Sequence, residues 1–314
     1  MVPVDVVRDL SLQRSPHAVT IGAYDGVHVG HQMIIASTRE AAASQGVKSA
    51  VVTFDPHPAY VVRPESAPKL LTTLDQKLEL LESVGVDTVV VVPFDRDAAS
   101  ESAEAFVDRV LVGCLSATSV VVGENFHFGR AREGTVDLLT KLGQLKGFAV
   151  AGLGLATVAG IPAPNVSSTT IRQALVEGNL DDATTMLGRF HEISGVVAHG
   201  DKRGRTIGFP TANVDIGPEF ALPCDGVYAG WFIDEHLNRC QAAINIGKRP
   251  TFYNEADRSL TEAHLLDFDG DLYGQTVRVQ FVKRLRDERP FAGIDELTQQ
   301  LSQDIGATRR ELAR

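Results

Sequence analysis

GAYDGVHVGHQ, residues 22–32, lies between the apolar run AVTI at 18–21 and the helix-like stretch MIIASTREAAASQ at 33–45. It therefore marks a point where a strand passes into a helix. The first turn of a helix has unpaired backbone N–H groups and a partial positive charge, which together favour phosphate binding. Because glycine lets the backbone come close to a ligand, Gly22 and Gly30 are candidate nucleotide-binding positions.

His28 and His31 flank Gly30 in this segment. If residues 28–31 form the first helical turn, the two side chains share one face of the helix. Two imidazoles placed there can donate hydrogen bonds to a phosphate group as its charge rearranges during nucleophilic attack. A pair of surface or capping histidines is the alternative, but the pattern H-x-G-H directly after a strand favours a catalytic pair.

Valine-rich runs recur along the first half of the chain and are separated by helical patterns. The expected strands are 18–23, 49–54, 88–94, 118–123 and 148–153, and the expected helices are 31–45, 73–84, 101–113 and 134–146. Apolar strands that alternate with helices are typical of a parallel sheet covered on both faces. We therefore predict a Rossmann-like α/β domain, in which ligands bind at the carboxyl ends of the strands.

The pattern changes near residue 187. Residues 171–189 predict two helices around a Gly-Asn turn, and residues 294–313 predict an amphipathic helix near the end of the chain. Between them, short apolar runs alternate with turn signals, which indicates an antiparallel barrel or sandwich. The expected strands are 191–200, 208–214, 226–234, 240–247, 262–270 and 275–285. The predicted domains are 1–186 and 187–314.

The composition of the 314 residues is that of a globular protein, with 44% hydrophobic and 22% charged residues. No run reaches the roughly 20 apolar residues that a membrane span needs, and the N-terminal segment does not resemble a signal peptide. The net charge of −10 argues against a general nucleic-acid-binding protein. The three scattered cysteines predict reduced, buried thiols in a cytoplasmic protein.

The segment SSTTIR at 167–172 places hydroxyl groups and an arginine at an expected helix start. Ser168, Thr169 and Arg172 suit the phosphates of ATP in that position. Since serine and threonine favour helix starts in any case, an ordinary N-cap is the alternative.

A basic, glycine-containing loop follows in the second half, within GDKRGRTIGFPTANV at 200–214. Such a loop can wrap phosphates through backbone amides and side chains; an exposed basic hairpin is the alternative. The candidate nucleotide-binding residues are Gly200, Lys202, Arg205 and Gly208. Thr211 and Asn213 are two apart, so on a strand they face the same side. Two neutral oxygen ligands suit a Mg²⁺ ion that is also held by nucleotide phosphates.

Together, the motifs of the first half resemble a known enzyme family. HVGH is similar to the HxGH signature of nucleotidylyltransferases. The wider segments resemble the FMN adenylyltransferase module of bacterial bifunctional riboflavin kinase/FAD synthetases; they are 22–32, TFDPHP at 53–58, GENFHFGRAREGT at 123–135 and VSSTTIRQALVEGNL at 166–180. The resemblance implies that Ser168, Thr169 and Arg172 hold the triphosphate.

Three residues of these segments are candidate flavin contacts. His57 stands between two prolines that stiffen its loop, and Asn125 follows the end of an expected strand. The ring of Phe128 can pack against an isoalloxazine. A structural role for His57 and a core position for Phe128 are the alternatives.

The second half resembles riboflavin kinases, whose GxxxGRxxGFPTAN signature matches residues 200–213. INIGKRPTF at 244–252 and the segment 284–304 also fit this family. Glu262, in LTEAHLLDFDGDLYG at 260–274, matches the family's catalytic glutamate, which implies that it orients or deprotonates the attacking hydroxyl. By itself, Glu262 is better explained as a solvated carboxylate on a strand, but the match of DFDGDLYG at 267–274 to the family favours the catalytic role.

The combined resemblance implies a bifunctional enzyme that makes FMN from riboflavin and Mg-ATP, and then FAD and pyrophosphate from FMN and a second ATP. FMN and FAD are then substrates and products rather than prosthetic groups. The expected partners are riboflavin, FMN and ATP, without nucleic acid or membrane, and a weak homo-oligomer stays open. The alternatives are a monofunctional enzyme, a flavin carrier or regulator, and a nucleotidyltransferase with another acceptor.

Overall fold

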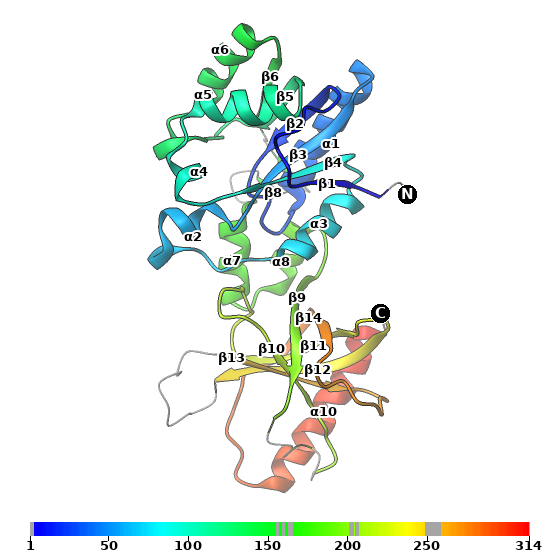
Figure 1. Cartoon of the computed structure of the whole chain (residues 1–314). Helices are drawn as coiled ribbons and strands as arrows, with labels where there is room; N and C mark the ends of the chain where they lie inside the picture. The colour runs from blue at the N-terminus through cyan, green and yellow to red at the C-terminus, as the bar shows by residue number, and fades with distance from the viewer. Residues whose placement is uncertain are drawn as a thin grey trace. The chain divides into compact units, whose positions relative to one another are not determined.

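The computed structural model describes residues 3–154, 157–158, 161–162, 166–200, 204, 207–248 and 259–313. The chain forms two compact units, which Figure 1 shows from blue to red along the sequence. The first unit contains Met1–Pro68 and Leu74–Ser167, and the second contains Lys69–Thr73 and Ser168–Arg314. Each unit is described by itself.

The first unit is an α/β domain around six parallel strands in the order β1-β4-β3-β2-β5-β6. These strands are β1 (Asp5–Val7), β2 (His17–Ile21), β3 (Lys48–Asp55), β4 (Thr88–Pro93), β5 (Ala117–Gly123) and β6 (Ala149–Leu153). The helices are α1 (Val29–Gln45), α2 (Pro58–Val62), α3 (Leu74–Ser83), α4 (Arg96–Ser100), α5 (Ala103–Phe106) and α6 (Val136–Lys146). Shorter elements are the 3₁₀ turns η1 (Pro64–Ser66) and η3 (Arg130–Arg132), the π-helix η2 (Val107–Cys114), and the two-stranded sheet of β7 (Thr157–Val158) and β8 (Ile161–Pro162). The predicted parallel sheet is confirmed, with β1 as an additional edge strand.

Alternation along the central strands explains why helices cover both faces of this sheet. On β4, Val90 and Val92 join a buried cluster with residues of α5, η2 and α6. Val89 and Val91 point to the opposite face and pack with residues of α1 and α3. Because successive side chains of a strand point to opposite faces, a continuous valine run is buried on both sides.

Helix α1 begins and ends through specific local chemistry. His28 is its N-cap, with an extended backbone, and its side chain accepts a hydrogen bond from the backbone N–H of His31. Gly46 ends the helix in the left-handed conformation at φ 66°, which favours glycine. The helix therefore starts two residues before the predicted start at 31, and this places His28 at the cap rather than inside the first turn.

The second unit contains a closed six-stranded antiparallel barrel in the order β10-β13-β12-β11-β14-β9. Its strands are β9 (His191–Ala198), β10 (Ala212–Asp215), β11 (Gly226–Ile233), β12 (Arg239–Lys248), β13 (Ser259–Leu265) and β14 (Thr276–Arg286). Its helices are α7 (Ser168–Val176), α8 (Leu180–Leu187) and α10 (Ile294–Leu312). Tyr228, Phe232 and Phe281 are the largest fully buried side chains of the barrel. Of the two architectures predicted for the antiparallel half, the structure thus has the barrel and not the sandwich.

Helices α7 and α8 group with the barrel by packing, because α8 contacts β9 and β14 while α7 contacts α8. The backbone N–H of Cys224 also donates to the carbonyl of Leu175 on α7. The boundary at 186/187, which separates the two predicted functional domains, stays a prediction.

Two further sequence expectations concern cysteines and membranes. Cys114, Cys224 and Cys240 are free thiols, of which Cys114 is buried and the other two are partly buried. Among the residues that the structure describes, no helix combines the length and the apolar character needed to cross a membrane.

Candidate functional site

The two histidines of the first unit lie side by side at the N-terminus of α1, next to the carboxyl end of β2. The backbone N–H of His31 donates to Nδ1 of His28 at 3.3 Å. The two rings stack, with their centroids 3.5 Å apart and their planes 18° apart. His28 is buried and His31 is partly buried. The structure therefore brings both predicted histidines to one helix end, where backbone N–H groups and the helix dipole favour an anion.

A strained turn holds this pair. Tyr24 and Val27 have positive φ angles of 50° and 39°, and Gly26 has a φ of 82°. Non-glycine residues rarely adopt this region, and such strain concentrates at functional sites. The hydroxyl of Tyr24 shares a 2.6 Å hydrogen bond with Thr20, and burial raises the pKa of Tyr24 above its ordinary value.

The Tyr24 ring also contacts the two candidate residues on either side of it. It meets the ring of His31 edge-on, with centroids 4.9 Å apart. A Cβ at Gly22 would lie 3.0 Å from the Tyr24 ring, so the absence of a side chain at Gly22 leaves room for this packing. Gly30 is buried within α1. Tyr24 was not a sequence-predicted site residue, because its role depends on the backbone conformation of the turn.

Electrostatics keep His31 neutral near pH 7. Burial lowers the pKa of His31 well below its usual value, and the neighbouring His28 and the charge of Lys77 lower it further. Lys77 on α3 is itself buried. No pattern in the sequence identifies Lys77 as a site residue, since a lysine in an amphipathic helix usually reaches solvent.

The other candidate residues of the first unit differ in their exposure and in their contacts. His57 caps α2, and its Nδ1 accepts a hydrogen bond from the N–H of Ala59 at 3.1 Å. Asn125 is exposed just after β5. Phe128 is only 8% exposed and packs in the core with Phe106. The contacts of His57 and Phe128 are those of a cap and a core residue, and their flavin-binding roles stay predictions.

Ser168, Thr169 and Arg172 lie together on α7, which Ser168 begins. Nε of Arg172 donates a hydrogen bond to the backbone carbonyl of Lys69. These residues belong to the second compact unit, together with Lys69. Their joint action with His28 and His31 stays a prediction.

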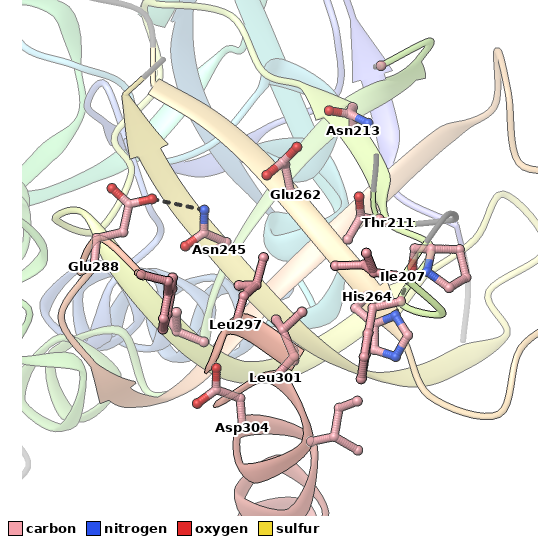
Figure 2. Close-up of a pocket in the computed structure, with 18 of the residues that line it drawn as sticks. Ile207, Thr211, Asn213, Asn245, Glu262, His264, Glu288, Leu297, Leu301 and Asp304 are labelled. Atoms are coloured by element: carbon pink, nitrogen blue, oxygen red, sulfur yellow. Dashed lines mark hydrogen bonds between the residues drawn. The ribbon is translucent and has the colours of Figure 1, made fainter. Parts of the chain in front are cut away.

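A pocket of about 420 Å³ opens on the outer wall of the barrel in the second unit. On its floor, Glu262 of β13 stands opposite Asn213 of β10 on one side and opposite Asn245 of β12 on the other. Figure 2 shows Glu262 between the two asparagines. Sequence analysis found Asn213 and Glu262, but the position of Asn245 depends on strand register.

Thr211 and His264 extend this polar floor. Thr211 precedes β10, which begins only at Ala212. His264 has its ring 5.7 Å from that of Phe209 and a 2.7 Å contact from Nδ1 to the carbonyl oxygen of Pro210. Because a carbonyl only accepts hydrogen bonds, Nδ1 of His264 carries the proton. This bond fixes the backbone directly before Thr211.

The predicted glycine loop is close to this floor where it is described. A Cβ at Gly200 would lie 2.3 Å from Nδ2 of Asn213. Gly208 has a φ of 85°, which favours glycine. Lys202 and Arg205 lie outside the described residues.

Helix α10 and the segment before it supply the remaining wall of the pocket. Its apolar side contributes Leu297, Leu301 and Ile305. The partly buried Arg286 of β14 forms an ion pair with the buried Asp304 of α10, with Nη2 and Oδ2 2.8 Å apart. Nδ2 of Asn245 donates to Glu288 at 3.1 Å, the dashed line in Figure 2. The pocket therefore has a polar floor and an apolar wall, which suits a ligand with a flat ring and a polar tail.

The polar floor offers oxygen donors that fit a hard divalent cation. Thr211 provides a hydroxyl, Asn213 an amide and Glu262 a carboxylate, and all three line the pocket. Mg²⁺ takes few protein ligands when nucleotide phosphates supply the others. In the described ranges, no group of three or more His, Cys, Asp and Glu side chains is arranged to hold a metal by itself. The donor set thus fits Mg²⁺ that arrives with a nucleotide.

Comparisons with known proteins match two family models to the chain. The family model of FAD synthetase matches residues 11–170, and the model of riboflavin kinase matches residues 187–312. A protein from Bacillus subtilis, named bifunctional riboflavin kinase/FMN adenylyltransferase, is 37% identical over 93% of this chain and 91% of its own. Proteins of the same name from Escherichia coli and Pseudomonas fluorescens are each 40% identical. They align over 91% and 98% of this chain, and over 90% and 97% of their own.

Among solved structures, a Streptococcus pneumoniae protein described as a macrolide-efflux protein has a similar fold. Its TM-score is 0.85 at 28% identity, and the match covers 98% of this chain and 99% of the other. The similarity therefore extends over both units.

Proposed function

Because the chain belongs to the family of bifunctional riboflavin kinase/FMN adenylyltransferases, we propose that two separate sets of its residues carry out the two reactions. The enzyme phosphorylates riboflavin with ATP in its C-terminal part, giving FMN. It transfers an adenylyl group from ATP to FMN in its N-terminal part, giving FAD and pyrophosphate. The proposal concerns which side chains act in each reaction.

For the kinase, we assign the pocket on the barrel. Glu262 accepts the proton of the ribityl 5′-hydroxyl as that oxygen attacks the γ-phosphorus of ATP. Thr211 and Asn213 would hold Mg²⁺, which when bound with ATP neutralises charge on the phosphates. The position of Glu262 directly opposite Asn213 supports this assignment, because it places the base and the phosphate-binding end on adjacent strands.

The rest of the pocket then accommodates the remaining parts of the substrates. The apolar side of α10 suits the flavin ring, and Asn245 with Glu288 forms a polar end. Gly200, Lys202, Arg205 and Gly208 cover the nucleotide in this proposal. The close approach of Gly200 to Asn213 supports this nucleotide-covering role for the described part of the loop.

For adenylyl transfer, we assign the histidine pair of α1. A phosphate oxygen of FMN attacks the α-phosphorus of ATP and pyrophosphate leaves. Since Nδ1 of His28 accepts the cap hydrogen bond, a neutral His28 carries its proton on Nε2, and this N–H donates a hydrogen bond to the reacting phosphate. His31 provides the second imidazole, and Gly22 and Gly30 allow the backbone to approach the nucleotide.

The remaining assignments follow the predicted motifs. Ser168, Thr169 and Arg172 hold the triphosphate, and the flavin contacts are His57, Asn125 and Phe128. The functional domains in this proposal are 1–186 and 187–314; the start of the riboflavin kinase match at residue 187 supports the beginning of the second. We also propose a cytoplasmic enzyme without nucleic-acid or membrane partners, at most weakly self-associated; its free thiols support the cytoplasmic assignment.

One observation carries the assignment of two sites: His28 and Glu262 lie in different compact units. Single substitutions should therefore separate the activities. The purified protein is incubated with riboflavin, ATP and Mg²⁺, and the flavins are separated by chromatography over time. FMN should appear first and FAD afterwards.

Glu262→Ala should abolish FMN formation and leave the conversion of supplied FMN to FAD nearly intact, and His28→Ala should do the reverse. The matched control for the kinase is Glu235→Ala, because Glu235 is an exposed carboxylate outside the pocket. If both site substitutions impaired both reactions equally, the assignment of a separate catalytic group to each reaction would be wrong.

A further inference from the structure

Lys77 is a buried lysine to which the proposed function assigns no role in either reaction. It lies on α3, beside Gln76 and one turn before the buried Leu81, and it is only 7% exposed. A lysine is almost never buried in this way unless its ammonium group is paired. Its surroundings therefore need an explanation.

The ammonium group has three acceptors, which match its three N–H donors. Nζ lies 3.2 Å from the carbonyl oxygen of Ala23, 3.2 Å from Oγ1 of Thr53 and 3.3 Å from the carbonyl oxygen of Phe54. The hydroxyl of Thr53 in turn donates to the Ala23 carbonyl at 3.1 Å. All four groups belong to the first unit.

These contacts join the carboxyl ends of two adjacent parallel strands. Ala23 follows β2 and directly precedes the strained turn that leads to His28 and His31. Phe54 is near the end of β3 and precedes the loop of His57. One buried cation thus holds the starting points of both loops at the candidate nucleotide site.

Two carboxylates offset part of the effect of burial on Lys77. Burial lowers the pKa of Lys77, whereas Asp25 and Asp55 raise it. The titratable groups that act on His31 are His28 on its own helix turn, Lys77 from α3 and the Tyr24 ring from the preceding turn. The Lys77 charge is therefore close enough to influence the histidine pair as well as the backbone.

We propose that Lys77 is a positioning residue for adenylyl transfer, which fixes the ends of β2 and β3 through the carbonyls of Ala23 and Phe54 and thereby holds the turn that carries His28 and His31. The inference rests on the proposed function of the histidine pair. It extends that function to a residue outside the recognised motifs, which acts without touching the substrate.

The first test compares Lys77→Met with Lys141→Met, a matched substitution of an exposed lysine on α6 of the same unit. A displacement of about 1 Å in a catalytic group can cost about 10²-fold in rate. We expect kcat of FMN adenylylation to fall between ~10-fold and ~10²-fold in Lys77→Met, with the KM values for FMN and ATP nearly unchanged. Riboflavin kinase activity of the same protein should be unchanged, as should both activities of Lys141→Met.

A second readout follows the histidines directly by NMR. Removal of the Lys77 charge should shift the ring resonances of His31 and raise its pKa, whereas a merely structural weakening of α3 would leave the His31 titration in place. Lys77→Met with wild-type adenylylation kcat, or with an unchanged His31 titration, overturns the inference.

Thr53 provides a test if Lys77→Met does not fold. Thr53→Val keeps the shape but removes the hydroxyl between Lys77 and Ala23, so adenylylation should fall; Thr53→Ser keeps the hydroxyl and should restore it. Equal rates in these two variants would overturn the inference.

His28→Ala is assayed in the same series. If His28→Ala loses adenylylation while the Lys77 and Thr53 variants keep it, this inference fails and the proposed function stands. If His28→Ala keeps adenylylation, the proposed function of the histidine pair fails, and this inference fails with it.

Discussion

The imidazole rings of His28 and His31 are stacked 3.5 Å apart, and Nδ1 of the first accepts the backbone N–H of the second. The cap hydrogen bond and the ring stack join the two side chains into one structural unit at the start of α1. Two positive charges at this distance would repel each other strongly. Protonation of one ring therefore disfavours protonation of the other, and this adds to burial, the main cause of the lowered pKa of His31.

This coupling predicts non-additive kinetics. His28→Ala and His31→Ala should each lower kcat/KM for FMN adenylylation by roughly 10²–10³-fold, the usual cost of losing one preorganised donor. The double variant should be little worse than the poorer single variant, because residues that act as a unit do not contribute additively. Measurement of kcat/KM for the three variants checks this. Losses that multiply in the double variant would show that the two rings act independently.

Gly200 provides a sharp test of the kinase site. In Gly200→Ala the new Cβ would lie 2.3 Å from Nδ2 of Asn213. Since the Asn213 side chain can rotate away, stability should change little while riboflavin kinase activity falls between ~10-fold and ~10²-fold. Adenylylation should be unchanged. The matched control is Gly293→Ala, at a position where a Cβ would meet nothing within 4 Å. Full kinase activity in Gly200→Ala would place Asn213 outside the reaction.

The sequence predicted the middle of the sheet well because β3, β4 and β5 are largely buried on both faces, so that each contains a run of valines. β1 was not predicted, since three residues, Asp5–Val7, are too short for a periodic signal. The histidine pair and Glu262 were found through local motifs. Asn245 was missed because its place beside Glu262 results from the register of β12 and β13.

Tyr24 and Lys77 were missed for a different reason. The role of Tyr24 depends on a positive φ angle, which no simple residue pattern predicts for a tyrosine. Lys77 is buried only because the ends of β2 and β3 present acceptors to it. The role of Lys77 arises from tertiary contacts between segments that are distant in the sequence, whereas that of Tyr24 arises within one local turn.

The ion pair between the partly buried Arg286 and the buried Asp304 should stabilise the barrel and the wall of its pocket. Nε and Nη2 of Arg286 both donate to the Asp304 carboxylate, which is 5% exposed. Asp304→Asn leaves the arginine without its counter-charge, and breaking such a pair costs about 3 kcal/mol. Because α10 lines the pocket, the KM for riboflavin should rise as well. Urea unfolding, followed by the fluorescence of Trp231 on β11, the only tryptophan of the chain, measures the stability.

An exposed pair offers a matched control for this substitution. Arg309 of α10 also pairs with Asp267, with Nη2 and Oδ1 2.7 Å apart, but both side chains are exposed to solvent. Asp267→Asn should leave the urea midpoint unchanged, because exposed ion pairs contribute little. Equal effects of Asp267→Asn and Asp304→Asn would contradict the importance of burial.

The burial of His191 leads us to expect that the barrel loses stability in acid. It is 2% exposed, stacks on Phe281 and contacts the carbonyl oxygen of Ala221 at 2.9 Å through Nε2. Burial lowers the pKa of His191 to about 4, whereas an unfolded histidine has a pKa near 6.5. Between these values the unfolded chain binds a proton that the folded barrel does not. The stabilisation is therefore complete above about pH 6.5 and is lost as the pH falls toward 4.

The size of this effect follows from the difference between the two pKa values. Two and a half units correspond to about 3 kcal/mol of unfolding free energy. His191→Gln keeps a donor for the Ala221 carbonyl but does not titrate. Urea unfolding at a series of pH values, with Trp231 fluorescence as the probe, should show that wild type loses more stability in acid than this variant, by about that amount. Curves for the two proteins that stay parallel from pH 8 to pH 4 would exclude His191 as the source, since every other group titrates alike in both.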